Sequence, residues 1–291
     1  MRYANALSVK SQIQCVLFYF MEIPLHIVPR LLRTTVLLCC VTFAGGALAA
    51  EGDKSFEPMV GQSGRDVVWV PTPEVLVEKM LDVARVTPKD YVMDLGSGDG
   101  RNIIAAAKRG ARALGVEFNA EMVEFSKRVA EKAGVADKAQ FVQGDMYEAD
   151  ISQATVLALF LLPENLNKLA PKFLALKPGS RIVANHFAVS GWEPDESGRA
   201  EGDCGSWCNW LLYIVPAQAD GRWRLQKGEL ELEQKFQMLT GTFNLNGVST
   251  AVENGRLLGE QITFTLGGKE YKGKVSGDAI SGSGWNATRV K

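Results

Sequence analysis

Three acidic residues, Asp94, Glu117 and Asp145, stand at the ends of short apolar runs. Asp94 leads into Gly96-Ser97-Gly98-Asp99-Gly100, where glycines allow the backbone to approach a ligand closely. Because the carboxyl ends of parallel strands meet at one edge of a sheet, we expect the three carboxylates to face one site. Glu117, 23 residues after Asp94, is placed to accept both hydroxyls of a ribose. Asp145 is placed to accept the amino group of an adenine.

The glycine spacing differs from that of a dinucleotide-binding site. Such a site needs the pattern G-x-G-x-x-G and faces a pyrophosphate with the N-terminus of a helix. Here the pattern is G-x-G-x-G, and Arg101 takes the third required position. Asp94 also puts a negative charge where the pyrophosphate would lie. The residues therefore favour a cationic ligand over an anionic one.

Helix and strand patterns alternate between Pro71 and Phe187, which is typical of a parallel, doubly wound sheet. Asn119 has the side chain of a helix N-cap. The sequence therefore predicts an α/β fold with a doubly wound, mostly parallel, Rossmann-like sheet. We expect its strands over residues 91–95, 113–117, 140–143, 155–161 and 181–187, and its helices over residues 74–86, 102–108 and 120–134.

After about Trp207 the pattern changes to period-two alternation without helices. This predicts a small C-terminal antiparallel β meander or barrel over residues 228–291. The strand pair over residues 210–226 fits either sheet, and we place the join near Lys227. Residues 191–205 are interpreted as a loop. Hairpin turns are expected at Asn246-Gly247, Asn254-Gly255, Gly267-Gly268 and Gly277-Asp278.

The N-terminus has the pattern of a signal peptide. Arg30 and Arg33 precede an apolar run over residues 35–44, and the small residues Ala47 and Ala49 follow it. We expect residues 1–49 to be removed on export to the periplasm, which leaves residues 51–227 for the first domain. The alternative is an uncleaved inner-membrane anchor, although the run is shorter than the roughly 20 residues that a span needs. The true start is either Met1 or Met21.

Composition and charge exclude several classes of protein. The chain has 291 residues, 46% of them hydrophobic, and a net charge of −1, which is typical of a globular protein. Loss of residues 1–49 leaves 28 basic and 32 acidic residues, so the exported chain has a charge of −4 and no general attraction for nucleic acid. It keeps Cys204 and Cys208, which form either a disulfide or two buried thiols. With a single remaining histidine, His186, it has too few ligands for zinc, and we expect no metal.

Several ordered motifs resemble those of the class I S-adenosylmethionine-dependent methyltransferases: DLGSGDGR, GVEFN, GDM, LALFLLP and LKPGSRIV. More narrowly, Val70-Pro71-Thr72-Pro73, DLGSGDGRN and Phe160-Leu161-Leu162-Pro163 are similar to the ATP synthase c-subunit lysine N-methyltransferases and their bacterial relatives. This closer resemblance covers about residues 67–194. The signal sequence and the C-terminal meander lie outside it.

The resemblance implies S-adenosylmethionine as cofactor and assigns residues to its parts. Asp94 would bind the ammonium group of the methionine part, Glu117 the ribose and Asp145 the adenine amino group. Phe118 and Met146 would flank the adenine ring. The complete set of implied cofactor-binding residues is Pro71, Thr72, Asp94, Gly96, Ser97, Gly98, Glu117, Phe118, Asp145 and Met146.

Methyl transfer from a sulfonium is an in-line displacement, so the enzyme mainly supplies alignment and a site without bulk water. A lysine acceptor must also lose its proton. The candidate acceptor-side residues are Glu164, Asn185 and His186, and His186 is either a base or a packed residue. Trp69 and Trp192 could wall a lysine channel or pack in the core.

We therefore expect a methyltransferase that acts on protein lysine. Methylation of a small-molecule or lipid-like acceptor is one alternative, and an exported binding protein without catalysis is another. Methylation of nucleic-acid bases is disfavoured because Phe160-Leu161-Leu162-Pro163-Glu164 replaces the Asn/Asp-Pro-Pro-aromatic motif of such enzymes. Membrane association is left open, and the sequence indicates neither the acceptor nor the oligomeric state.

Overall fold

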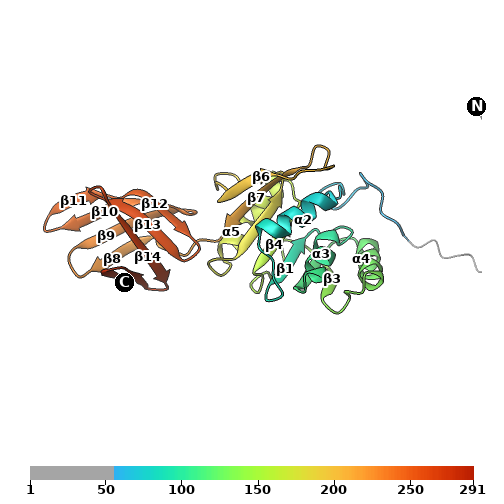
Figure 1. Ribbon diagram of the computed structural model, residues 1–291, viewed down its shortest axis with the longest axis horizontal. Coiled ribbons are helices and arrows are strands. Elements are labelled where there is room, and N and C mark those ends of the chain that lie inside the picture. The colour runs from blue at the N-terminus through green and yellow to red at the C-terminus, as the bar shows by residue number, and fades with distance from the viewer. Residues whose placement is uncertain (1–55) are drawn as a thin grey trace, which may run out of the picture. The chain divides into compact units, whose positions relative to one another are not determined.

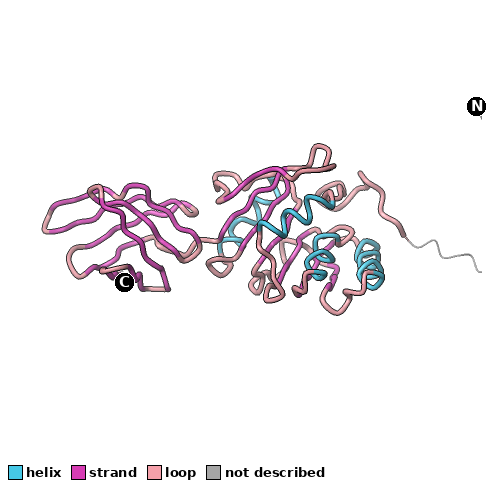
Figure 2. Tube along the Cα trace, in the orientation of Figure 1, coloured by secondary structure: helices cyan, strands magenta, loops and turns pink. Residues whose placement is uncertain are grey.

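The computed structural model describes residues 56–291 of the chain, which form one compact unit. The expected signal peptide and its cleavage site lie outside the described residues. No helix within residues 56–291 is long and apolar enough to cross a membrane. Two sheets share the described chain, and Figures 1 and 2 show that the helices belong to the first of them.

The first sheet has seven strands in the order β3-β2-β1-β4-β5-β7-β6 (Figure 1). Its first five strands in this order run parallel, β7 is antiparallel to β5, and β6 is antiparallel to β7. The predicted doubly wound, mostly parallel sheet is therefore confirmed. Its strands are β1 (Tyr91–Leu95), β2 (Arg112–Glu117), β3 (Ala139–Gln143), β4 (Val156–Leu159), β5 (Arg181–Asn185), β6 (Glu196–Arg199) and β7 (Asn209–Ile214).

Helices pack on both faces of this sheet, because successive side chains of its buried strands point to opposite sides. Val92 of β1 joins a core cluster with buried residues of α2 (Glu74–Val83), α3 (Arg101–Lys108) and α4 (Ala120–Lys132). The next residue, Met93, joins a second cluster with α5 (Pro163–Leu174). As predicted, the Asn119 side chain caps α4, accepting hydrogen bonds from Glu121 N and Met122 N.

The chain order creates a switch point between β1 and β4. From β1 the chain moves outward to β2 and β3, and it then returns to place β4 on the other side of β1. Ligands of open α/β sheets bind at such a point, at the carboxyl ends of the strands. The turns after β1, β2, β3, β4 and β5 all lie at this edge. This is the edge at which the three carboxylates were expected to meet.

Two predictions about the region after β5 are corrected. The segment over residues 191–205, interpreted as a loop, contains β6, which pairs with β7. The expected strand pair over residues 210–226 is not a hairpin, because β7 pairs with β5 whereas β8 (Gly221–Leu225) belongs to the second sheet. The change of sheet lies between Ile214 and Gly221, earlier than the join placed near Lys227. Two strands adjacent in sequence have the same pattern whether or not they pair, so their periodicity could not separate them.

The second sheet is antiparallel and closes into a barrel through pairing of β9 with β10, with β11 as an extension beside β10. The prediction of a meander or barrel is confirmed. The expected turn at Asn254-Gly255 is wrong: both residues lie in β12, at a register shift between Glu253 and Arg256. The strands after β8 are β9 (Glu229–Lys235), β10 (Met238–Leu245), β11 (Val248–Ala251), β12 (Glu253–Leu258), β13 (Gln261–Leu266), β14 (Lys269–Ser276), β15 (Ala279–Gly282) and β16 (Trp285–Arg289).

Candidate active site

The turn after β1 brings backbone close to the edge of the sheet. Gly96, Gly98 and Gly100 all have positive φ, a conformation that glycine adopts without steric cost. Gly98 is also tightly packed, since a Cβ there would lie 2.5 Å from Nε1 of Trp69. Any larger residue at position 98 would displace the Trp69 indole. The turn therefore needs glycine for both its conformation and its contact with Trp69.

Asp94 is a buried carboxylate that is only half satisfied. Its Oδ2 accepts a hydrogen bond of 2.9 Å from Asn102 Nδ2, while Oδ1 has no partner among the described residues. Burial raises the pKa of Asp94, the Asn102 hydrogen bond lowers it, and the charges of Glu117 and Asp99 raise it, so that the pKa is about 7. A buried anion with a free acceptor suits a cationic ligand, because the ligand would supply the missing partner.

Glu117, at the end of β2, is oriented by two backbone N–H groups. Gly98 N donates to Oε2 and Asn119 N donates to Oε1, each at 2.9 Å. Each carboxylate oxygen has further acceptor capacity. The carboxylate is thus held rigidly at the cavity wall with two acceptors for neighbouring hydroxyls, as the predicted role with a ribose requires.

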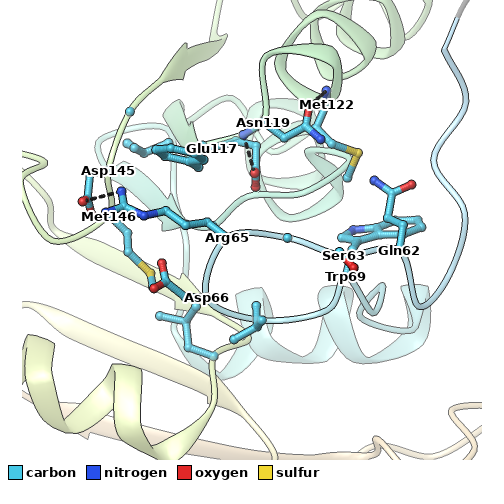
Figure 3. A pocket seen from close by; sticks show the side chains of 17 residues that line it. Gln62, Ser63, Arg65, Asp66, Trp69, Glu117, Asn119, Met122, Asp145 and Met146 are labelled. Atoms are coloured by element: carbon cyan, nitrogen blue, oxygen red, sulfur yellow. Dashed lines mark hydrogen bonds and ion pairs between the residues drawn. The ribbon is translucent and has the colours of Figure 1, made fainter.

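Asp145 and Phe118, which were expected to bind adenine, both contact Arg65. Figure 3 shows the Arg65 side chain beside Asp145. Arg65 donates to Asp145 Oδ2 at 2.7 Å, and its guanidinium carbon lies 4.5 Å from the centre of the Phe118 ring. The backbone N–H of Tyr147 and the charge of Arg65 hold the pKa of Asp145 below its ordinary value. We call the region formed by Phe118, Asp145 and Met146 the adenine corner. A planar cation takes the place predicted for the planar base.

Arg65 is carried by a short hairpin over residues 61–69. Gly61 N donates to Trp69 O, Trp69 N donates to Gln62 O, and Ser63 pairs with Val68. Gly64 N bonds to Val67 O and closes the tip that presents Arg65. The cavity at the adenine corner has a volume of about 80 Å³, well below the roughly 300 Å³ at which small-molecule sites begin. The hairpin must therefore move for a ligand of nucleoside size to enter.

A second cavity, of about 240 Å³, adjoins the first at the glycine turn. Gly96, Leu161 and Trp69 line both cavities. We call the second one the aromatic cavity, because three of its walls are Phe160, Phe187 and Trp207. Its other lining residues include Pro71, Thr72, Asp94, Ser97 and Gly98, all predicted to bind the cofactor.

The aromatic rings of this cavity form one cluster. Ring centres of Phe160 and Trp207 are 5.3 Å apart, and those of Phe187 and Trp207 are 6.0 Å apart. His186 lies behind the wall, edge to face with both Phe187 and Trp207 at 5.0 Å. His186 has a φ of 65°, and Phe187 N donates back to Asn185 O at 2.7 Å. Such a strained three-residue turn is typical of functional sites. Here it positions Phe187, which follows β5 and lines the aromatic cavity.

The three candidate acceptor-side residues line neither cavity. The Asn185 side chain is completely buried, with no hydrogen-bond partner for either polar atom among the described residues. His186 packs against the aromatic wall, and Glu164 is exposed in the first turn of α5. Their catalytic role stays a prediction. Of the two tryptophans proposed for a lysine channel, Trp69 lines both cavities.

Trp192, the other proposed wall, lies in the core. It is 2% exposed and stacks on Phe236 with ring centres 5.2 Å apart. The sequence analysis missed Arg65, Phe187 and Trp207 as site residues. Arg65 and Trp207 belong to no strand-end motif, and Phe187 was predicted as the last residue of a strand, whereas β5 ends at Asn185. For Trp207 the sequence held a weak signal, which is its position between Cys204 and Cys208. These two cysteines form a disulfide. The alternative of two free thiols is wrong.

Comparison with known proteins identifies similar chains over the first sheet. The family model described as the ANTKMT methyltransferase domain matches residues 94–196. A protein-lysine N-methyltransferase of Saccharolobus islandicus (strain REY15A) is 47% identical over 133 residues, which are 45% of this chain and 83% of that protein. The ATP synthase c-subunit lysine N-methyltransferase of Mus musculus is 35% identical over 130 residues, which are 44% of this chain and 52% of that protein.

A solved structure is also similar. The RNA methyltransferase from Salinibacter ruber, crystallised in complex with S-adenosyl-L-homocysteine, is 42% identical with a TM-score of 0.48. The match covers 51% of this chain and 95% of that chain. The family match ends at Glu196, so it includes the glycine turn, Glu117 and Asp145 and excludes the barrel. It also excludes Trp207 and the disulfide.

Proposed function

The chain belongs to the protein-lysine N-methyltransferases, which take a methyl group from S-adenosylmethionine, and from this premise we propose that it methylates a lysine side chain of another protein. The narrower likeness to the ATP synthase c-subunit branch was predicted from the motifs and agrees with the matched relatives. The chain spans about half the length of the mouse relative, so the acceptor of that enzyme is not transferred to this chain.

One observation carries the proposal: two cavities of different chemistry meet at the glycine turn. The adenine corner and Glu117 offer carboxylates and an aromatic face for a nucleoside, whereas the aromatic cavity combines the Asp94 carboxylate with a wall of three aromatic rings. Because Gly96, Leu161 and Trp69 line both, a methyl group held at this shared wall would face the aromatic cavity. This is the arrangement that an in-line transfer between two ligands needs.

The chain's own residues fit the cofactor, which supplies a methyl group on a positively charged sulfur. Asp94 lines the aromatic cavity next to the turn, and its unpaired Oδ1 would accept from the ammonium group. Glu117 would hold the ribose through the acceptor capacity that its two backbone bonds leave free. Pro71 and Thr72 line the same cavity, and Arg101 donates to Thr72 O at 2.7 Å. This bond ties the Pro-Thr-Pro segment to the helix that follows the turn.

On the acceptor side, the aromatic cavity would act through desolvation. A lysine ammonium that leaves water for an apolar cavity has a lower pKa, so it loses its proton to solvent more readily before transfer. The rings of Phe160 and Trp207 would attract the lysine ammonium while it is still protonated, and they would pack along the methylene chain of the lysine. No dedicated base is required by this scheme.

Transfer of labelled methyl groups tests the proposal. The protein is incubated with methyl-labelled S-adenosylmethionine and an extract of its source cells, which is then separated into protein, lipid and RNA. We expect label in protein, in acid-stable methyl-lysine after hydrolysis. Label confined to lipid or small molecules would show that the acceptor is not a protein but a molecule of that kind. Label in RNA would contradict a protein acceptor. Absence of cofactor binding at millimolar concentration would favour a binding protein without catalysis.

We also propose that the protein is exported. The signal-peptide pattern over residues 1–49 supports this, and so does the Cys204–Cys208 disulfide, since disulfides persist mainly in oxidising compartments. Sequencing the N-terminus of the native protein tests export. A start at Ala50 or Glu51 is expected, and an intact Met1 or Met21 would contradict cleavage.

A further inference from the structure

Trp207, like Trp69 of the hairpin, is a ring of the aromatic cavity that comes from outside the sheet edge. Phe160 follows β4 and Phe187 follows β5, so regular strands position both. Trp207 lies in the segment over residues 200–208, which connects β6 to β7 and contains neither helix nor strand. Its ring still reaches Phe160, at 5.3 Å between centres. Something other than strand pairing must hold it there.

The disulfide supplies this constraint. It joins the residue directly after Trp207 to the residue three positions before it, with Cα atoms 5.2 Å apart. Trp207 N also donates to Cys204 O at 3.0 Å, and Ala200 N donates to Cys208 O at 2.9 Å. Both cysteines are buried, at 3% and 2% exposure. The bridge thus closes a turn that carries Trp207 and anchors it beside the β6–β7 pair.

The rest of the segment offers little rigidity. Gly202 and Gly205 both have positive φ, and Ser206 adds no hydrogen bond of its side chain within the described residues. Because the loop closed by the bridge is short, its contribution to global stability is small, and its effect is local. Without the bridge, the turn would sample conformations that take the indole away from the cavity.

We infer that Trp207 is a specificity-determining wall of the acceptor site, and that the Cys204–Cys208 disulfide is the device that positions it. The inference rests on the proposed function and names the residue that selects the acceptor. The ligand of this wall is a long unbranched alkyl chain that ends in an amine: the methylenes pack on the indole, and the ammonium lies near its face. The positions concerned lie beyond the family match, which ends at Glu196.

The test follows binding rather than turnover, because the natural acceptor is unidentified. The full chain, with isotope-labelled tryptophan side chains and saturated with S-adenosylhomocysteine, is titrated with Nα-acetyl-lysine methylamide, and the indole N–H signals are recorded by NMR. Trp207→Phe assigns the Trp207 signal. Nα-acetyl-norleucine methylamide, which lacks the amine, is the matched probe. Trp285→Phe, in the barrel, is the matched control variant.

We expect the Trp207 signal to shift saturably with the lysine probe. The Cys204→Ser/Cys208→Ser variant should bind this probe at least about fivefold more weakly, the size of a lost cation–π contact, with unchanged affinity for S-adenosylhomocysteine. Trp207→Leu should have the same effect, and Trp207→Phe should restore part of the affinity. The control variant Trp285→Phe should bind both ligands as the wild type does.

The outcomes separate the inference from the proposed function. Equal binding of the lysine probe by wild type, Trp207→Leu and the double serine variant would overturn the inference and leave the function standing. A Trp207 shift that is as strong with the norleucine probe would keep Trp207 as the wall but contradict lysine as the acceptor. Absence of binding by both probes to the wild type would overturn both.

Discussion

The two cavities on either side of the glycine turn were built in different ways. The first cavity uses charged groups at strand ends: Glu117 is the last residue of β2, and Asp145 lies two residues after β3. The aromatic cavity combines rings from the ends of β4 and β5 with one from a disulfide-closed turn. The carboxylates of the first cavity are placed by local sequence, whereas its Arg65 and the Trp207 of the second cavity are placed by tertiary or covalent contacts.

This difference also affects how each cavity is filled. In the first, Arg65 already satisfies Asp145 and covers Phe118, so a ligand must displace a protein group. In the second, Asp94 has a free buried oxygen, so a ligand completes a hydrogen-bonding arrangement. A cofactor that occupies both cavities should therefore gain binding free energy from its contact with Asp94. Displacing Arg65 from Asp145 and Phe118 should offset part of this gain. The following variants separate these two contributions.

The largest effect is expected for Asp94→Asn. Removing one charge of a buried ion pair is costly, and we expect affinity for S-adenosylmethionine to fall about 100-fold or more. Isothermal titration calorimetry measures the loss, with Asp137→Asn, an exposed acid, as control. In the wild type, affinity should rise with pH up to about 7 and then level off, since the ionised form of Asp94 binds the cation. Affinity independent of pH between 5.5 and 8, roughly one unit or more on either side of that value, would contradict this role.

The same substitution should stabilise the protein without cofactor. The pKa of Asp94 is raised from 3.8 to about 7 in the folded state, so between these values the folded state binds a proton that the unfolded state has lost. Stability therefore decreases as the pH rises through this range, and the full cost remains above it. We expect Asp94→Asn to raise Tm by roughly 3 °C or more at pH 8 and by less at pH 5. A lower Tm at pH 8 would show that the carboxylate is stabilising.

Glu117→Ala should have the next largest effect. The substitution removes the acceptor of two backbone N–H groups and of the two proposed ribose hydroxyls. We expect cofactor affinity to weaken by about 1–3 kcal/mol. Glu117→Gln, which keeps the shape and one acceptor, should fall between the alanine variant and the wild type. Glu121→Ala, in the first turn of α4, is the control. Calorimetry with unchanged affinity for Glu117→Ala would reject the ribose assignment.

The same contrast explains how much the sequence could predict. The mostly parallel, doubly wound sheet, the glycine turn and the positions of Asp94, Glu117 and Asp145 followed from local patterns, because each residue lies at or just after the end of a strand. The role of residues 61–69 and of Trp207 did not, because their contacts join residues far apart in sequence. Arg65 and Asp145, for example, are separated by 80 positions. Single-sequence periodicity contains no information on such pairings.

The misplaced sheet boundary has a related cause. β7 and β8 are adjacent in sequence, and both are short strands with buried apolar residues, but they belong to different sheets. For Trp192 the sequence left two alternatives, a wall of a lysine channel or packing in the core, and the structure shows the second. The Trp192 ring stacks on Phe236, 44 positions later in the sequence. In both cases the position in the fold depends on which distant segment the strand or ring contacts, and the local sequence does not contain this information.

A smaller effect, of opposite sign, is expected for Arg65→Ala. An exposed ion pair and a cation–π contact are together worth about 1 kcal/mol, so their removal should strengthen cofactor affinity about two- to tenfold. Arg85→Ala removes the same charge at an exposed position 3.9 Å from Glu196 and should leave affinity unchanged. The gain should shrink as salt screens the wild-type ion pair. Weaker binding by Arg65→Ala would mean that the guanidinium contacts the cofactor and does not compete with it.

The smallest effect on binding is expected for Asn119→Ala, although this residue lines the first cavity. Its side chain caps α4, while its backbone N–H, which the substitution keeps, orients Glu117. Stability in urea should therefore fall by about 1 kcal/mol, with cofactor affinity almost unchanged, and Asn119→Asp should restore the cap. A large loss of affinity with normal stability would show that the Asn119 amide binds the ligand directly. Ligand binding in the cavity at the adenine corner would then depend on the Asn119 side chain as well as on the carboxylates and the aromatic ring.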